Sequence, residues 1–244
     1  MLDPSALALV AVAVFVGATL NSLMGFGFAL TTVPLMAIAV GPKDAVVLSA
    51  LFGLLSNGGV ALRHRAEAVV PVLRRIVLGA LVGMPIGLAV ILVVPESALE
   101  AAIGVVVLAA VVLLARGWVI ERPPPWVDVV AGLGTGLLNT SVGVSGPPVV
   151  MDLQGRSLPK GPFRATSAAV FGINGIVALA LFAVSGQLHV DLAAAAAVAL
   201  PAWPLGWWVG DSLHRRFPDD RFRGLVLLML AATAVITLVG ALTG

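Results

Sequence analysis

One short polar motif occurs twice in this chain, as Asn21-Ser22-Leu23-Met24-Gly25-Phe26-Gly27 and as Asn139-Thr140-Ser141-Val142-Gly143-Val144-Ser145-Gly146-Pro147-Pro148. Both copies lie inside long apolar stretches without charge, at 6–41 and 129–151. In a bilayer, backbone N–H and C=O groups that leave a helix persist only where protein or a cavity surrounds them. We therefore predict that both motifs break membrane-embedded helices and that the two breaks form the functional site.

The composition assigns the chain to the membrane proteins. Of its 244 residues, 60% are hydrophobic and only 11% are charged, whereas about a quarter of a soluble domain is charged. The apolar runs are long and lack a two-residue alternation, so the predicted fold class is all-α integral membrane. The chain has no cysteine, which excludes disulfides, thiolate catalysis and thiolate metal ligands. We expect no cofactor and no metal. We also expect no nucleic acid partner, because the basic residues lie in short loops between spans, where the positive-inside rule accounts for them.

Matching residues recur in the two halves of the chain at an almost constant spacing. Asn21 and Asn139 are 118 positions apart, and Phe52-Gly53 and Phe171-Gly172 are 119 apart. Gly25 with Gly143, and Pro85-Ile86-Gly87 with Pro204-Leu205-Gly206, repeat these two spacings. We predict one membrane domain made of two repeats, 1–122 and 123–244, each with one hairpin and three spans. The first repeat has a hairpin at 5–41 and spans at 45–62, 76–94 and 99–115. The second has a hairpin at 126–153 and spans at 163–184, 192–209 and 224–242.

The distribution of basic residues indicates how the segments cross the membrane. If all eight segments cross, the 14 Lys and Arg residues divide almost evenly between the two sides. If the 126–153 hairpin is re-entrant, all except Lys43 share one side, which the positive-inside rule strongly favours. The loops 63–75, 116–125, 154–164 and 212–223 are then cytoplasmic. Each repeat makes three crossings, so the repeats have inverted topology; whether the first hairpin is re-entrant or crosses fully stays open.

The hairpin tips are suited to a small anion. The limb at 29–40 has 12 residues and is about 18 Å long, somewhat over half of the ~30 Å hydrocarbon layer. The N-terminus of each returning limb therefore points its free N–H groups at the membrane centre, where they favour negative charge. Glycines allow the backbone to approach a ligand, and Pro147 fits a first helical turn. Alternatively, the polar side chains only satisfy the broken backbone. The candidate substrate-binding residues of the tips are Asn21, Ser22, Gly25, Phe26, Gly27, Asn139, Thr140, Ser141, Gly143, Ser145, Gly146 and Pro147.

Other polar and small residues admit two interpretations each. Ser56, Asn57 and Asn174 either wall the same cavity or make interhelical hydrogen bonds. The ridge Gly79, Gly83 and Gly87, with its counterpart at 202–210, predicts close packing within the bundle, and a homodimer seam is the alternative. We expect Asp152 and Asp211 near span ends to face water, with proton coupling as the alternative. The three histidines lie near span ends, which argues against a metal site.

An enzymatic function is an alternative raised by one short string. Gly143-Val144-Ser145-Gly146 matches the GxSG pattern of intramembrane serine proteases. Such an enzyme needs a histidine that reaches the serine from another helix, and all three histidines are near span ends. We therefore predict that the protein is not an enzyme.

The duplicated motifs resemble those of the TauE/SafE family of sulfite and organosulfonate exporters. The resemblance covers essentially the whole chain, and its specific part is Gly25-x-Gly27 with Pro34, and 143–147. Members often show a GxGGG pattern, which Phe28, Ala29 and Ser145 interrupt here. The resemblance implies a multi-pass permease of the cell inner membrane that exports sulfite or a short sulfonate such as sulfoacetate or taurine. It also implies a proton as the coupling ion. A permease for a short carboxylate is the second hypothesis, and an anion channel is the third.

Overall fold

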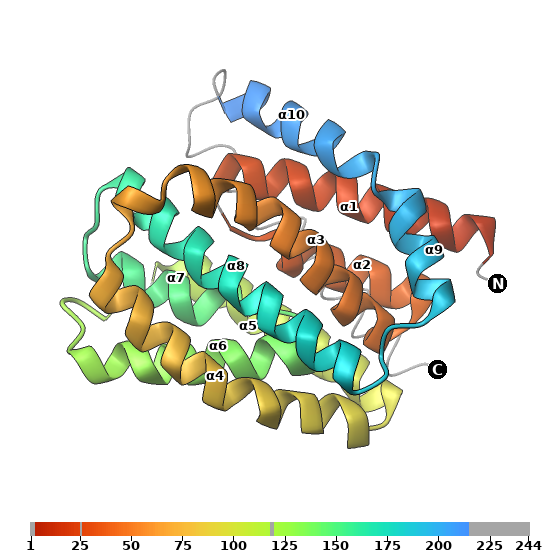
Figure 1. Cartoon of the computed structure of the whole chain (residues 1–244), viewed down its shortest axis with the longest axis horizontal. Helices are drawn as coiled ribbons and strands as arrows, with labels where there is room; N and C mark the ends of the chain where they lie inside the picture. The colour runs from red at the N-terminus through yellow and green to blue at the C-terminus, as the bar shows by residue number, and fades with distance from the viewer. Residues whose placement is uncertain (1–2, 25, 118–119, 215–244) are drawn as a thin grey trace.

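The computed structural model describes residues 3–24, 26–117 and 120–214, and within these ranges every regular element is a helix. Figure 1 shows the helices lying side by side, most of them running along the length of the molecule. Gly25, most of the 212–223 loop and the predicted span 224–242 fall outside the described residues. The helices are α1 (Pro4–Met24), α2 (Phe28–Val40), α3 (Pro42–Arg63), the 3₁₀ helix η1 (Arg65–Glu67), α4 (Val70–Val93), α5 (Glu96–Arg116), α6 (Pro125–Ser141), α7 (Gly146–Gly155), α8 (Lys160–Val184), α9 (Val190–Ala199) and α10 (Ala202–His214).

Six helical segments are long and apolar enough to cross a bilayer, among the residues that are described. They are Pro4–Ser22, Pro42–Arg63, Val70–Val93, Glu96–Leu113, Lys160–Val184 and Val190–Leu213. The chain is therefore an all-helical, multi-pass membrane protein. The segment predicted as one helix at 192–209 is divided into α9 and α10, which Leu200 and Pro201 separate. Proline lacks the backbone N–H that would continue the α9 ladder, and it interrupts the helix at this point.

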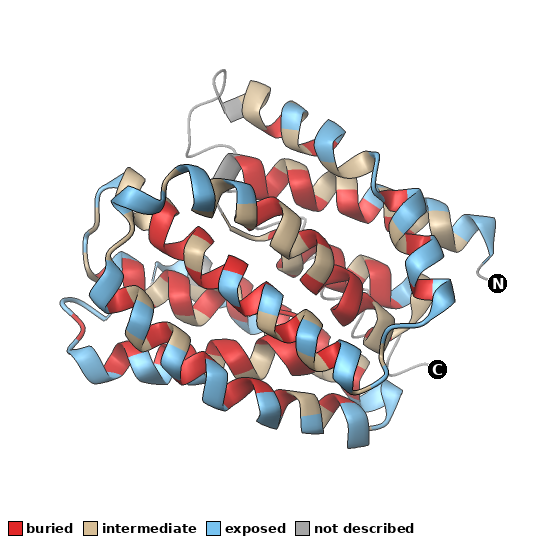
Figure 2. Ribbon diagram, in the orientation of Figure 1, coloured by how far each residue is buried: buried red, intermediate tan, exposed pale blue. Residues whose placement is uncertain are grey.

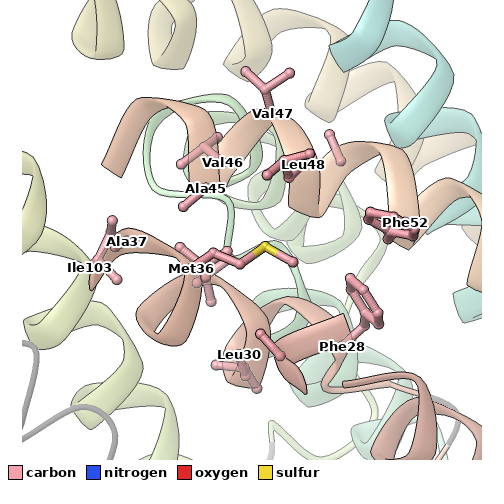
Figure 3. Packing of buried hydrophobic residues seen from close by; sticks show 14 of the residues in the cluster. Phe28, Leu30, Met36, Ala37, Ala45, Val46, Val47, Leu48, Phe52 and Ile103 are labelled. Atoms are coloured by element: carbon pink, nitrogen blue, oxygen red, sulfur yellow. The ribbon is translucent and has the colours of Figure 1, made fainter. Parts of the chain in front are cut away.

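The short helix α2 lies in the hydrophobic core. Eight of its 13 residues are buried, α2 contacts α3 and α5, and Phe28 and Met36 belong to the same buried cluster as Phe52 and Ile103 (Figure 3). Figure 2 shows the buried residues concentrated along the inner faces of the helices. The outer face of α4 instead exposes large apolar side chains such as Val82 and Val93, as a lipid-facing surface does. A 13-residue helix that is surrounded by protein in this way need not span the bilayer.

Two seams of glycine hold the hairpins against other helices. On α4, a Cβ at Gly79, Gly83 or Gly87 would overlap the backbone of α6, and a Cβ at Gly132 or Gly136 would overlap α4 in return. On α10, a Cβ at Gly206 or Gly210 would overlap the backbone of α1. The glycine ridges therefore serve close packing within the chain, as the sequence predicted.

The described parts of three basic loops, 63–75, 116–125 and 154–164, gather at one end of the bundle. The N–H of Arg122 donates to the carbonyl of Gly155 (2.9 Å), so the chain segments before α6 and after α7 lie side by side. The N–H of Val69 donates to the Thr166 hydroxyl (2.9 Å), which brings the 63–75 loop to the start of α8. At the other end, His189 Nε2 lies 3.0 Å from Asp44 Oδ1. The α6–α7 hairpin thus begins and ends at the same end of the bundle (Figure 1).

Candidate functional site

Both sequence motifs interrupt a helix, as predicted. The first interruption separates α1 from α2, and the second separates α6 from α7. Gly27 and Gly143 have φ angles of +98° and +73° in these breaks. Those angles belong to the left-handed region that glycine occupies without steric cost. The motif glycines therefore allow the chain to reverse inside the bundle.

One cavity lies between the two breaks, and both of them line it. The first break contributes Asn21 and residues 26–30, and the second contributes Asn139, Gly143, Ser145 and Gly146. The helix that follows each hairpin supplies a wall, because α3 contributes Ser49, Ala50, Gly53, Leu54 and Asn57, and α8 contributes Phe171 and Gly175. Segments more than 100 positions apart in the sequence thus form a single site.

The cavity wall is polar but uncharged. None of the described residues that line it is Asp, Glu, Lys, Arg or His. Asn21, Asn57 and Asn139 are 5%, 5% and 7% exposed, so their amides are almost completely withdrawn from the surface. The Ser49 hydroxyl is buried without a hydrogen-bond partner, and Asn57 Nδ2 donates to the carbonyl of Gly53 (2.8 Å). Such a wall offers hydrogen bonds to a ligand without a permanent counter-charge.

The N-terminus of α2 opens on the cavity. Gly27, Phe28, Ala29 and Leu30 all line it, and no side chain caps this end of the helix. The first N–H groups of a helix have no partner within the helix, and the helix dipole adds positive potential there. The α7 N-terminus also lacks a side-chain cap, but Pro147 and Pro148 occupy its first turn and have no N–H to donate. The stronger set of backbone donors therefore belongs to α2.

The structure brings eight of the predicted tip and wall residues to the cavity and places others elsewhere. The eight are Asn21, Phe26, Gly27, Asn57, Asn139, Gly143, Ser145 and Gly146. Ser22, Thr140, Ser141, Pro147, Ser56 and Asn174 do not line this cavity. Gly25 lies outside the described residues.

Hydrogen bonds explain the placement of several of the residues that are away from the cavity. The Thr140 hydroxyl donates to the carbonyl of Met84 on α4 (2.7 Å), and the Ser141 hydroxyl donates to Leu137 (2.7 Å). Trp203 Nε1 donates to the Ser56 hydroxyl (2.8 Å). Ser56 therefore makes an interhelical hydrogen bond, which is one of the two roles that the sequence allowed for it. Asn139 Nδ2 approaches the backbone carbonyl of Asn174 at 3.5 Å. Except for the Ser141 bond, which stays within α6, these contacts join the helices that surround the site.

A cluster of charged residues beside the second hairpin was not predicted. Asp128, in the first turn of α6, has no exposed surface, and Arg75 Nε donates to its carboxylate (2.5 Å). Arg156 Nη2 donates to the other oxygen of Asp128. Asp152 is only 2% exposed, with Arg156 Nε at 3.5 Å, so the prediction that it faces water is wrong. The cause is a long-range contact, since Arg75 of α4 and Arg156 after α7 meet at these side chains, which no local sequence pattern indicates.

The histidines do not approach Ser145 in the part of the chain whose side chains are described. His64 Nδ1 lies 3.0 Å from Glu67 Oε1 and His189 Nε2 lies 3.0 Å from Asp44 Oδ1, so each has a partner away from the cavity. The Thr135 hydroxyl donates to the Ser145 carbonyl (3.2 Å) and fixes the backbone of the tip. In the same described ranges, no group of three or more His, Cys, Asp or Glu residues is arranged to hold a metal ion.

A comparison with known protein families assigns nearly the whole chain to one family. The sequence profile of the family described as "Sulfite exporter TauE/SafE" matches residues 9–237, which is nearly the entire chain. The chain belongs to this family. TauE/SafE proteins are membrane transporters for sulfite and related anions, so the protein is a multi-pass anion transporter of this family. No curated protein sequence and no solved structure matches the chain.

Proposed function

We propose that this TauE/SafE protein exports sulfite or a two-carbon organosulfonate, such as sulfoacetate or taurine, across the inner membrane. Transport is driven by the proton gradient and proceeds by alternating access. The observation that carries this proposal is the uncharged cavity between the two helix breaks, with the uncapped N-terminus of α2 opening on it. A compact oxyanion matches such a set of donors in size and charge.

The residues of the two helix breaks have distinct roles in this mechanism. The first N–H groups of α2 bind the oxyanion, and the side-chain amides of Asn21 and Asn139 orient it from opposite halves of the chain. Because none of the described residues that line the cavity is lysine or arginine, the interaction is weak enough for release on the other side. Gly27 and Gly143 allow the backbone to remain close to the ligand.

The alternating-access mechanism rests on an inverted repeat of residues 1–122 and 123–244. Reciprocal contacts support it: α4 of the first half packs on α6 of the second, and α10 of the second half packs on α1 of the first. The hydrogen bond from Arg122 N–H to the Gly155 carbonyl supports a re-entrant second hairpin, whose two ends share one side of the membrane. The proposed cytoplasmic side is the end with the basic loops.

The topology can be tested by cysteine accessibility, because the chain has no cysteine of its own. Val119→Cys and Ser157→Cys precede and follow the second hairpin. A membrane-impermeant thiol reagent applied to intact cells should label neither, and it should label both in inverted vesicles. Labelling from opposite sides would contradict the re-entrant hairpin.

The substrate site can be tested by Asn139→Leu in proteoliposomes. This change keeps the size of the side chain but removes its amide, so proton-driven sulfite transport should fall to background while folded protein remains in the membrane. Ser141→Ala is the matched control in the same helix, because its hydroxyl donates to Leu137 and does not line the cavity. Unchanged transport by Asn139→Leu would overturn the site.

A further inference from the structure

A second, smaller hollow adjoins the central cavity, and in this structure it is too narrow to admit a water molecule. Asn21 and Asn57 line both of them, so these two side chains lie where the two spaces meet. The second hollow also has Ser22, Arg164 and Trp207 in its wall. We call these three residues the vestibule. In contrast to the central cavity, the vestibule contains a permanent positive charge.

Two buried donors in the vestibule have no hydrogen-bond partner among the described residues. Ser22 is 4% exposed, and its hydroxyl makes no hydrogen bond. The Nε of Arg164 is also buried without a hydrogen-bond partner. None of the described residues that line this hollow is acidic. Leaving a buried hydroxyl and part of a guanidinium unsatisfied is unfavourable, whereas an anion between them would satisfy both.

The vestibule lies toward the end of the bundle that carries the basic loops. Arg164 is in the second turn of α8, two residues before Thr166, which accepts the hydrogen bond from Val69 in the 63–75 loop. Val60, near the end of α3, also lines the hollow. An anion that leaves the cytoplasm would therefore meet Arg164 before it reaches Asn21.

The first half of the chain has no equivalent charge. At the spacing of 119 that relates the spans, the counterpart of Arg164 is Ala45, which has no exposed surface. The counterpart of Ser22 at a spacing of 118 is Thr140, whose hydroxyl already donates to Met84. The donor pair is therefore specific to one side of the central cavity.

We infer that Arg164 and Ser22 form a vestibule subsite, closed in this structure, which opens during transport to bind a small oxyanion before it passes Asn21 and Asn57 into the central cavity. This inference rests on the proposed anion transport and adds a second binding step to it. The guanidinium attracts the anion, the Ser22 hydroxyl donates to one of its oxygens, and the indole of Trp207 provides an apolar wall. The anion then exchanges a charged partner for the neutral donors of the cavity.

The subsite can be tested by the kinetics of sulfite transport from the face with the basic loops. Arg164→Gln should raise KM for sulfite about tenfold or more, because it removes a charge-assisted hydrogen bond, and it should change kcat little. Arg164→Lys should restore most of the affinity because it keeps the charge. Arg63→Gln is the control, since Arg63 is exposed at the same end of the bundle and lines neither hollow. An unchanged KM in Arg164→Gln, with folded protein, would overturn the subsite and leave the central site standing.

A second readout does not depend on transport. In Ser22→Cys, the new thiol should react faster with an anionic methanethiosulfonate that carries a sulfonate than with its cationic trimethylammonium analogue. Adding Arg164→Gln should lower this rate ratio about fivefold or more, because the local positive charge is lost. A ratio that does not depend on Arg164 would overturn the subsite. If the ratio depends on Arg164 but no sulfur oxyanion is transported, the anion subsite stands and the proposed substrate is wrong.

Discussion

The two hairpin tips have similar sequences but offer a ligand different groups. The first tip opens the N-terminus of α2 on the cavity, where Phe28, Ala29 and Leu30 each carry an N–H. The second tip has Pro147 and Pro148 in the first turn of α7, so it lacks two of the corresponding donors. The duplicated motif has therefore diverged, and in our account the first tip binds the anion while the second tip orients it.

The two hairpins also differ in how firmly they are held. Five glycines form the α4–α6 seam, and Asp128 joins Arg75 and Arg156 at the base of the second hairpin. Two glycines, Gly206 and Gly210, form the corresponding seam between α10 and α1. At the spacing of 118, the first hairpin has Val10 in the place of Asp128. We infer that the second hairpin is the more rigid support of the site.

Among the substitutions that test this difference between the hairpins, Asp128→Asn should lower the stability of the protein most. The carboxylate is fully buried between two arginines, and its neutralisation removes both of these ion pairs and leaves Arg156 with Asp152 alone. We expect a loss of about 3–5 kcal/mol in the free energy of unfolding, measured by denaturant titration in detergent. Asp44→Asn is the control, because its partner His189 is partly exposed and the pair should contribute under about 1 kcal/mol. Equal losses in both variants would contradict the proposed rigidity of the second hairpin.

A smaller loss is expected from Gly83→Ala in the α4–α6 seam. The new Cβ would overlap the backbone carbonyl of Leu133, which cannot move without shifting the helix, so stability should fall by about 1–3 kcal/mol. Gly134→Ala on α6 is a matched control, because its Cβ would meet only Pro148 Cγ at 3.8 Å. That control should be neutral or slightly stabilising, since alanine favours a helix. Thermal unfolding of both variants measures the difference, and a stable Gly83→Ala protein would argue against the tight seam.

The smallest expected effect on stability, with a clear effect on transport, comes from Gly27→Ala. A Cβ here would meet no atom within 4 Å, so the cost is the left-handed backbone alone, about 1–2 kcal/mol. Relief of that strain would tilt the first N–H groups of α2, and kcat/KM for sulfite should fall about tenfold or more. Gly143→Ala should be less stable than Gly27→Ala, because its Cβ would also lie 2.8 Å from Val33 Cγ2. Full transport by Gly27→Ala would show that the anion does not bind at the first tip.

Much of the architecture was predictable because polar residues and glycines are conspicuous in apolar sequence. Asn21, Gly27, Asn139 and Gly143 identified both helix breaks, and the breaks do line one cavity. The sequence could not separate neighbours such as Ser56 and Asn57, of which one bonds Trp203 and the other lines the cavity. Apolar residues surround both, so no periodicity indicates which face of the helix is inward.

The charged residues were harder to predict because their environment depends on tertiary packing. Asp128, Asp152 and Arg164 lie near the ends of helices, where charged side chains usually reach water. Here Arg75 and Arg156 pair with the buried Asp128, Arg156 also lies beside the buried Asp152, and Arg164 of α8 lines the same hollow as Ser22 of α1. The sequence contains one usable signal for Arg164. At the repeat spacing of 119 its counterpart is Ala45, so the two halves of the chain differ in charge at this position.

The most direct test of the central claim is a thermal-shift panel on the purified protein. A ligand that binds the folded state raises its Tm according to ln(1 + [L]/Kd), so the panel compares sulfite, sulfoacetate, taurine, isethionate, acetate and sulfate. Our account predicts that sulfite or a two-carbon sulfonate raises the Tm selectively, and that Asn139→Leu abolishes the increase. If only acetate raises the Tm, the substrate is a carboxylate and not a sulfur oxyanion. An unchanged Tm with all six ligands would contradict the oxyanion site.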